Sequence, residues 1–173
     1  MRIPLALRAA LSLALGLVVT FQQDHNPHFG LKVLATFGLG VAAISVVSAF
    51  LNRSSFAAIE AIPVAVVAAI IGVLAILAND TNEPPIYDRF NNLVAAWGLI
   101  AGVYELYLAR RAGFRSVNGK DSLLSSVLAL ALGVLFLLEP IRIDITTGVG
   151  FLGAYLVVSS VHLGIAAASQ SKG

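Results

Sequence analysis

LVAAWGLIAGVYELYLA, residues 93–109, is the stretch that decides the fold, and two arginines follow it directly. It is about as long as a helix must be to cross the hydrocarbon layer, for which about 17–25 apolar residues are needed. Gly98 and Gly102 are four residues apart, a spacing that lets two membrane helices approach closely. A pair of arginines is typical of the cytoplasmic end of such a helix. The stretch therefore predicts a membrane-spanning helix that carries one carboxylate, Glu105, on the same face as its glycines.

The whole chain has the composition of a membrane protein. Of its 173 residues, 58% are hydrophobic and 12% are charged, whereas about a quarter of an ordinary soluble domain is charged. Six spanning helices use most of this length, so we expect one membrane domain over residues 1–173 and no soluble catalytic domain. The net charge of +2 does not indicate a nucleic-acid partner, because the basic residues lie at the ends of apolar runs and form no stripe. The chain has no cysteine, which excludes disulfides and thiolate metal sites.

Six apolar runs predict an all-α integral membrane protein. They cover residues 3–21, 31–51, 56–78, 93–109, 123–138 and 145–168. One set of alternating connections is basic and holds Arg2, Arg53, Arg110, Arg111, Arg115, Lys120 and Lys172, with Asp121 as the one acid nearby. The other set is acidic and holds Asp24, Asp80, Glu83, Asp88, Glu139 and Asp144, with Lys32, Arg89 and Arg142 among or beside them. Because basic connections stay on the cytoplasmic side, we expect both termini to be cytoplasmic.

Glycines recur at similar places in the six runs. They are Gly16, Gly72 and Gly133 in the odd-numbered runs, and Gly40, Gly98 and Gly153 in the even-numbered runs. A turn with proline follows each odd-numbered run. The repeat predicts three tandem helical hairpins, each formed by an odd-numbered run and the run after it, with these glycines and Gly102 at helix contacts. The alternative is that glycines, which are frequent in membrane helices, align by chance.

This pattern resembles the HdeD-like family of small bacterial membrane proteins. The likeness is best over residues 97–169, through WGLIAGVYELYLARR, then LLSSVLALALGVLFLLEP, then the glycine-rich residues 153–164. The resemblance implies a six-helix protein of the bacterial inner membrane, linked to acid-stress resistance, with no catalytic residues to carry over.

Three ionisable side chains inside the apolar runs form the best candidate site. Arg8, Glu60 and Glu105 each lie about four to six residues from a predicted cytoplasmic end, or roughly 6–9 Å deep at about 1.5 Å per residue. Charges in hydrocarbon are costly, so we expect Arg8 to pair with one glutamate and the other to act as a proton-sensing or proton-carrying group. Pro63 is expected to kink its helix and to free the Ile59 carbonyl nearby.

The same charges also have a purely structural interpretation. Arg8 can reach the membrane surface with its long side chain, and Glu105 can fold down to one of the two arginines that follow its helix. The set would then only fix the register of the helices.

Two further polar groups are weaker candidates. Asp24, His25 and His28 in the first outward turn could bind a metal, but a closed zinc site needs four ligands, so we predict no metal and no cofactor. His162 in the last run, one turn from Ser159, is expected to form a hydrogen bond between helices.

Two functions from different classes remain open. The first is a non-enzymatic structural or stress-protective component, whose partners are the lipid bilayer and either further copies of the chain or the subunits of a larger membrane complex. The second is a transporter or channel for protons or a small solute that uses Glu60 and Glu105. The first predicts a dry bundle with small-residue faces turned to another chain, whereas the second predicts a hydrated cavity that reaches a glutamate. The sequence holds no nucleophile–base motif that would indicate an enzyme.

Overall fold

The protein is a bundle of six long helices. The computed structural model describes residues 2–51, 56–80, 86–138 and 144–169. Its helices are α1 (Arg2–Phe21), α2 (Pro27–Leu51), α3 (Phe56–Asn79), α4 (Ile86–Ala112), α5 (Val117–Leu137) and α6 (Ile145–Ser169), and these ranges contain no β-strand. All six helices are long and apolar enough to cross a membrane. The all-α class and six helices of sufficient length and apolarity to span a membrane are confirmed.

Three helices begin earlier than the apolar runs predict. α2, α4 and α5 start at Pro27, Ile86 and Val117, which is four to seven residues before the predicted starts. Local hydrogen bonds explain two of these starts. The Asn26 side chain accepts the backbone N–H of Phe29 at 2.8 Å, and the Ser116 hydroxyl accepts the backbone N–H of Gly119 at 3.0 Å. Such side chains satisfy backbone donors at a helix start, so the helix continues beyond the apolar run.

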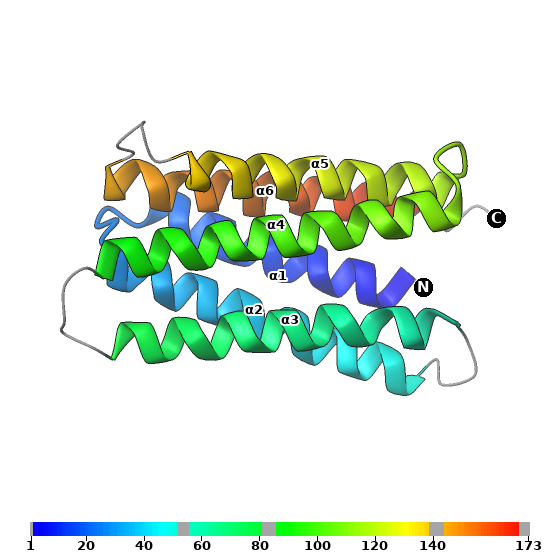
Figure 1. The fold of residues 1–173 in the computed structure, drawn as a ribbon, viewed down its shortest axis with the longest axis horizontal. Coiled ribbons are helices and arrows are strands. Elements are labelled where there is room, and N and C mark those ends of the chain that lie inside the picture. Colours follow the sequence, from blue (N-terminus) through cyan, green and yellow to red (C-terminus); the bar gives the residue numbers. More distant parts are fainter. Residues whose placement is uncertain (1, 52–55, 81–85, 139–143, 170–173) are drawn as a thin grey trace.

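The closest helix pairs are α1 with α6, α2 with α3, and α4 with α5. Consecutive helices run in opposite directions, and the start of α1 lies at the same end of the bundle as the end of α6 (Figure 1). The tight contacts therefore fall between the predicted hairpins, and the two helices within each predicted hairpin pack more loosely. Contact between the first and last helices closes the bundle into a ring.

Each tight pair has a glycine on both helices, and we call these three contacts the glycine seams. A Cβ atom added to Gly98 of α4 would lie 2.5 Å from the backbone nitrogen of Gly133 in α5. A Cβ on Gly38 of α2 would lie 2.9 Å from the nitrogen of Gly72 in α3. In the third seam, a Cβ on Gly16 would lie 3.1 Å from the backbone nitrogen of Val157 and 3.4 Å from the carbonyl oxygen of Gly153. Small residues allow the backbones of two helices to approach closely, and the first two seams are the tightest.

Two glycines from the predicted set have other surroundings. Gly40 faces the side chain of Leu11 in α1, whereas Gly38 faces α3. The seam glycine of α2 is therefore Gly38, two residues before the predicted Gly40. Gly102 faces the backbone and side chain of Leu130 in α5, and its carbonyl accepts a hydrogen bond of 2.7 Å from the buried Ser126 hydroxyl. Gly102 therefore extends the α4–α5 seam by one turn.

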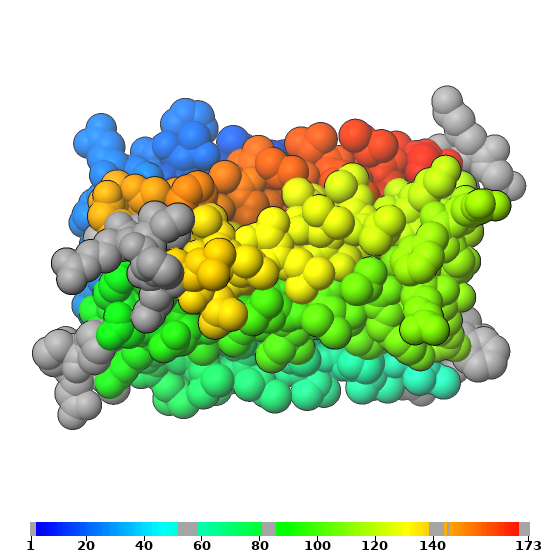
Figure 2. Space-filling view, turned by 45° about the horizontal axis from the view of Figure 1, so that its top comes forward, coloured from blue at the N-terminus to red at the C-terminus, as the bar shows by residue number. Residues whose placement is uncertain are grey.

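Large apolar side chains point outward from all six helices, among them Leu7, Val46, Ile70, Val103, Val127 and Val161. Figure 2 shows α3, α4, α5 and α6 running side by side along one face. An apolar outer surface of this extent is stable in hydrocarbon and not in water. The six helices and their outer surface indicate a multi-pass membrane protein.

The two ends of the bundle differ in charge. The end with the start of α1 also holds Arg110, Arg111, Arg115 and Lys120, and the opposite end holds Asp24, Asp80, Asp88 and Asp144. We call these the basic end and the acidic end. Arg53, Lys172, Glu83, Glu139 and Arg142 lie outside the described residues. Lys32 and Arg89 also lie at the acidic end, and Asp121 lies at the basic end, so the excess of each charge at its end, and not a complete separation, is what the described residues show.

Candidate binding cavity

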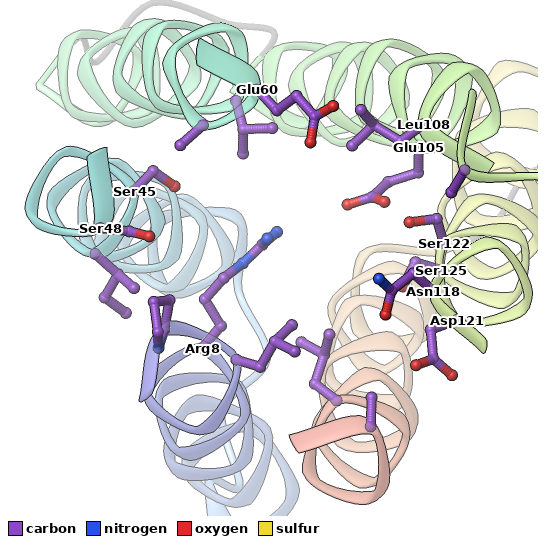
Figure 3. Close-up of a pocket in the computed structure, with 18 of the residues that line it drawn as sticks. Arg8, Ser45, Ser48, Glu60, Glu105, Leu108, Asn118, Asp121, Ser122 and Ser125 are labelled. Atoms are coloured by element: carbon purple, nitrogen blue, oxygen red, sulfur yellow. The ribbon is translucent and has the colours of Figure 1, made fainter. Parts of the chain in front are cut away.

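A cavity of about 370 Å³ lies at the basic end, between the first turns of α1, α3 and α5 and the last turns of α2, α4 and α6. Figure 3 shows side chains from these helices pointing into one central space. Deeper in the bundle, two smaller spaces of about 40 and 70 Å³ continue from it. They end against Trp97, and Phe37 packs on Trp97 edge to face, with ring centres 5.2 Å apart.

The layer below the cavity is apolar and closed. Phe37, Trp97 and Leu152 each precede a seam glycine of an even-numbered helix, and each is at most 4% exposed. The next layer toward the acidic end, Leu34, Val94 and Val149, is fully buried. We call these two layers the floor. The cavity is thus closed toward the acidic end.

The three predicted charged side chains all line the cavity. Arg8 comes from α1, Glu60 from α3 and Glu105 from α4. The three residues that were predicted to share one depth thus line one cavity. Their pairing differs from the prediction.

Arg8 and Glu105 face each other from opposite walls. Figure 3 shows the guanidinium and the carboxylate pointing into the same space. In the described part of the chain, no nitrogen of Arg8 lies within 4.0 Å of a carboxylate oxygen, and its buried Nε has no hydrogen-bond partner. Both residues also line the two smaller spaces, so they stand at the deep part of the cavity. The predicted pair of Arg8 with a glutamate is a facing pair without direct contact.

Glu60 forms the ion pair of the cavity. Its Oε1 lies 3.1 Å from a terminal nitrogen of Arg111, on the last turn of α4, and the two side chains are 28% and 44% exposed. The structural interpretation had let Glu105 fold down to Arg110 or Arg111. In the structure Arg111 pairs with Glu60, and Glu105 lies nearly two turns before Arg111 and points inward (Figure 3).

Pro63 lies inside α3, one turn after Glu60. The acceptor used near it is the carbonyl of Glu60, which takes a hydrogen bond of 2.7 Å from the Tyr104 hydroxyl of α4. The prediction had named the Ile59 carbonyl instead. Because a proline also disturbs the helix bonds beside its own missing donor, the neighbouring carbonyl is exposed to a partner as well.

Several further polar side chains complete the walls, and none of them was predicted to lie with the three charges. They are Ser45, Ser48, Asn118, Ser122, Ser125 and His162, together with the carboxylate of Asp121. His162 Nε2 lies 3.0 Å from the Asp121 carbonyl and 3.1 Å from the Ser125 hydroxyl, which confirms the predicted hydrogen bond between helices. Asp121 and Asn118 precede the apolar run that begins at residue 123, and the early start of α5 brings both into the wall.

The lining residues occupy equivalent positions when they are counted from the seam glycines. Eight residues before the glycines of α1, α3 and α5 stand Arg8, Val64 and Ser125. Twelve residues before them stand Pro4, Glu60 and Asp121, and all six of these residues line the cavity. The three odd-numbered helices therefore contribute residues to the cavity at the same two positions of the repeat.

The candidate metal ligands do not come together. His25 Nε2 lies 2.8 Å from the Val19 carbonyl, and His28 Nδ1 lies 3.2 Å from the side-chain oxygen of Asn79. Asp24 instead accepts a hydrogen bond of 2.9 Å from Asn26. In the described ranges, no three His, Cys, Asp or Glu side chains form a group that could hold a metal ion.

Comparison with known proteins adds no family assignment. No protein-family model, curated protein or solved structure matches this chain. The functional argument therefore depends on the cavity itself.

Proposed function

We propose that this protein is a non-enzymatic carrier of a bacterial plasma membrane, which takes a small polar solute into the cavity at its basic end. The single observation that supports this proposal is the facing pair of Arg8 and Glu105 across an open space. Moving a charged side chain to the centre of a membrane costs about 2.5–3.5 kcal/mol on insertion scales, and less toward the surface. A charge pair kept only for register would be expected to close into direct contact, which lowers that cost.

The alternatives set out from the sequence differ in what they require of the bundle interior. A protein that acts only through other chains needs a filled interior and small-residue faces turned outward. Here the glycines of the three seams face one another within the chain, and a space reaches both glutamates. This arrangement supports the carrier over an assembly protein that uses those glycines.

A carrier fits the cavity better than a channel does. A channel needs a continuous path, whereas the floor fills the axis with Phe37, Trp97 and Leu152. A carrier needs a site that is open to one side at a time, with a floor that opens when the first side closes. By the positive-inside bias, the basic end and its cavity face the cytoplasm in this proposal.

A second candidate is a stress-protective or accessory subunit, as the likeness to the HdeD-like family implies. One observation favours it: added Cβ atoms at Gly150 and Gly164 of α6 would meet nothing within 4 Å. These two positions are free for close approach by a helix of another chain. The two candidates differ in whether the floor ever opens.

Single cysteines test the proposal directly, because the 173 residues contain none. Ser125 lines the cavity, Ser126 is 1% exposed, and Val127 is on the outer surface. A membrane-impermeant maleimide is expected to label Ser125→Cys from the basic end alone, and to leave Ser126→Cys and Val127→Cys unlabelled. An Arg110→Cys variant reports which end is accessible in a given vesicle preparation.

The floor distinguishes a carrier from the other classes. Leu34 is fully buried toward the acidic end. A carrier is expected to label Leu34→Cys slowly from the acidic end, because that layer opens in part of the cycle. If Leu34→Cys stays unlabelled while Ser125→Cys reacts, the carrier proposal is wrong and the cavity belongs to a protein with one fixed state. An unreactive Ser125→Cys would show that the cavity is not hydrated at all.

A further inference from the structure

We propose that the ligand of this cavity is a small zwitterion that carries one carboxylate-like group and one primary or secondary ammonium group. The anionic group binds Arg8 and the ammonium group binds Glu105. This inference rests on the proposed solute-binding function and adds the chemical class of the solute.

Arg8 supplies the anion site. Its guanidinium offers five N–H donors and no acceptor, and its buried Nε has no partner among the described residues. A carboxylate or phosphate accepts two of these bonds side by side, which is the arrangement that arginine favours. Figure 3 shows the guanidinium directed into the cavity, so the donors meet the ligand and not the lipid.

Glu105 supplies the cation site on the opposite wall. Its carboxylate points into the same space from α4 (Figure 3). An ammonium group provides up to three donors for this carboxylate and for the Ser45 and Ser122 hydroxyls that also line the cavity. The two sites therefore bind opposite ends of one molecule across the space that keeps them apart.

The balance of charge selects a zwitterion over a simple ion. Glu60 and Arg111 neutralise each other at the mouth of the cavity. An anion alone would leave Glu105 uncompensated in a region of low dielectric, and a cation alone would do the same to Arg8. Asp121 is the remaining lining carboxylate, and Figure 3 shows it pointing away from Arg8 and Glu105.

The walls also limit the kind of ammonium group and the size of the ligand. Of the described residues that line the 370 Å³ cavity, none is Phe, Tyr or Trp, and such rings line only the two smaller spaces of about 40 and 70 Å³ beyond it. Quaternary ammonium groups are bound by aromatic rings, so a trimethylated ligand is not expected in the larger cavity. The volume of about 370 Å³ is near the lower end of the about 300–1,000 Å³ found for small-molecule sites. A short amino acid fits these limits.

Protection of the Ser125→Cys variant from maleimide measures the binding of each solute in a panel. The panel is glycine, β-alanine and γ-aminobutyrate, which separate the two charges by increasing distances, together with propionate, propylamine and glycine betaine. At least one of the three amino acids is expected to slow labelling tenfold or more at saturation. Propionate, propylamine and glycine betaine are expected to give no protection at the same concentrations.

Variants test the two named contacts. Arg8→Gln and Glu105→Gln are each expected to raise the half-protecting concentration by about ten- to a hundredfold, the usual range for loss of a charge-assisted hydrogen bond. Arg110→Gln and Asp88→Asn, which do not line the cavity, are the matched controls and are expected to leave protection unchanged. The double variant Arg8→Gln with Glu105→Gln keeps the net charge, so it folds if charge balance is what matters, and it is expected to lose protection.

The headgroup of phosphatidylethanolamine carries the same pair of charges, and two membranes distinguish it from a free solute. If the headgroup is the ligand, Ser125→Cys is labelled slowly in phosphatidylethanolamine nanodiscs and rapidly in phosphatidylglycerol nanodiscs, with no solute added. If Ser125→Cys reacts fully in every membrane and no zwitterion protects it, or if propionate or propylamine protects equally well, the zwitterion proposal is overturned. The proposed cavity function survives that result, whereas an unreactive Ser125→Cys would remove both.

Discussion

The glycine seam between α4 and α5 gives the sharpest test of the fold. In a Gly98→Ala variant the new Cβ would lie 2.5 Å from the Gly133 nitrogen, 2.6 Å from its Cα and 2.6 Å from the Ala129 carbonyl oxygen. All three atoms belong to backbone, so no side chain can turn aside. Because favourable contacts between heavy atoms need about 3.5–4.0 Å, the two helices must separate by about 1 Å.

The expected loss of stability follows from that separation. Overpacking of a close interface costs about 1–3 kcal/mol. Alanine also favours a helix over glycine by about 1 kcal/mol, which hides part of the cost. Gly164→Ala is the matched control, because its Cβ would meet nothing within 4 Å and it gains the same helical preference. The free energy of unfolding should therefore be lower for Gly98→Ala than for Gly164→Ala by about 1–3 kcal/mol.

Reversible unfolding in mixed detergent micelles measures this difference, and α2 offers a second comparison. Gly38→Ala meets the Ala68 carbonyl oxygen at 2.7 Å, whereas Gly40→Ala meets the end of the Leu11 side chain, which can move. We expect Gly38→Ala to behave like Gly98→Ala, and Gly40→Ala to cost less. Equal stabilities for Gly98→Ala and Gly164→Ala would refute the close backbone contact on which the ring of seams depends.

Two further predictions concern charges at the two ends of the bundle. Arg111→Gln should lower the free energy of unfolding in detergent by about 0.2–1 kcal/mol, the usual range for a partly exposed ion pair. Adding Glu60→Gln should restore most of this loss. A further loss in the double variant would contradict a pair between these two residues. At the acidic end, hydrogen bonds from Thr147 to its carboxylate hold the pKa of Asp144 below the usual range, so its ionised form stabilises the start of α6. This contribution is present above the unfolded-state pKa of Asp144 and is lost as the pH falls through its folded-state pKa. The difference in melting temperature between the wild type and Asp144→Asn should therefore shrink on acidification below about pH 4. A difference that is independent of pH would contradict the assignment.

Properties that depend on local sequence were predictable. Six helices follow from six apolar runs, and the common depth of Arg8, Glu60 and Glu105 follows from a fixed rise per residue. Neither property depends on which helices touch. The cavity therefore contains the side chains that the sequence singled out.

Helix pairing was not predictable from the same information. The repeated glycines indicate three similar helix contacts. They do not distinguish contacts between the two helices of one hairpin from contacts between helices of different hairpins. The contact of α1 with α6 joins the two ends of the chain, which no local pattern specifies. Gly38 and Gly40 lie on different faces of α2, and only the position of α3 decides which of them is the seam glycine.

The partner of Glu60 was missed because hydropathy underestimates helix length. Polar residues end an apolar run, but the helix continues while its backbone groups still find partners. α4 therefore continues to Ala112 and brings Arg111 back over the cavity. α5 begins at Val117, so Asp121 lies on a helix and not in a loop.

Comparison of equivalent positions shows where the chain departs from its own repeat. Four residues before the seam glycines of α1, α3 and α5 stand Ser12, Ala68 and Ala129, which are all small and at most 2% exposed. The floor is apolar at all of its described positions. The seams and the floor therefore keep the repeat.

The cavity breaks the repeat, and it does so with opposite charges. Arg8 is equivalent to Val64 and Ser125, and Glu105 is equivalent to Ser45 and Ser160, each seven residues after a seam glycine. A space left by imperfect packing would be lined by apolar or small residues at every equivalent position, because an unpaired charge in the membrane is costly. One arginine and one glutamate instead stand on opposite walls, so the field across the axis has a direction. A ligand with separated charges can align with such a field. A ring with the same residues at all three equivalent positions could not provide a field with a direction.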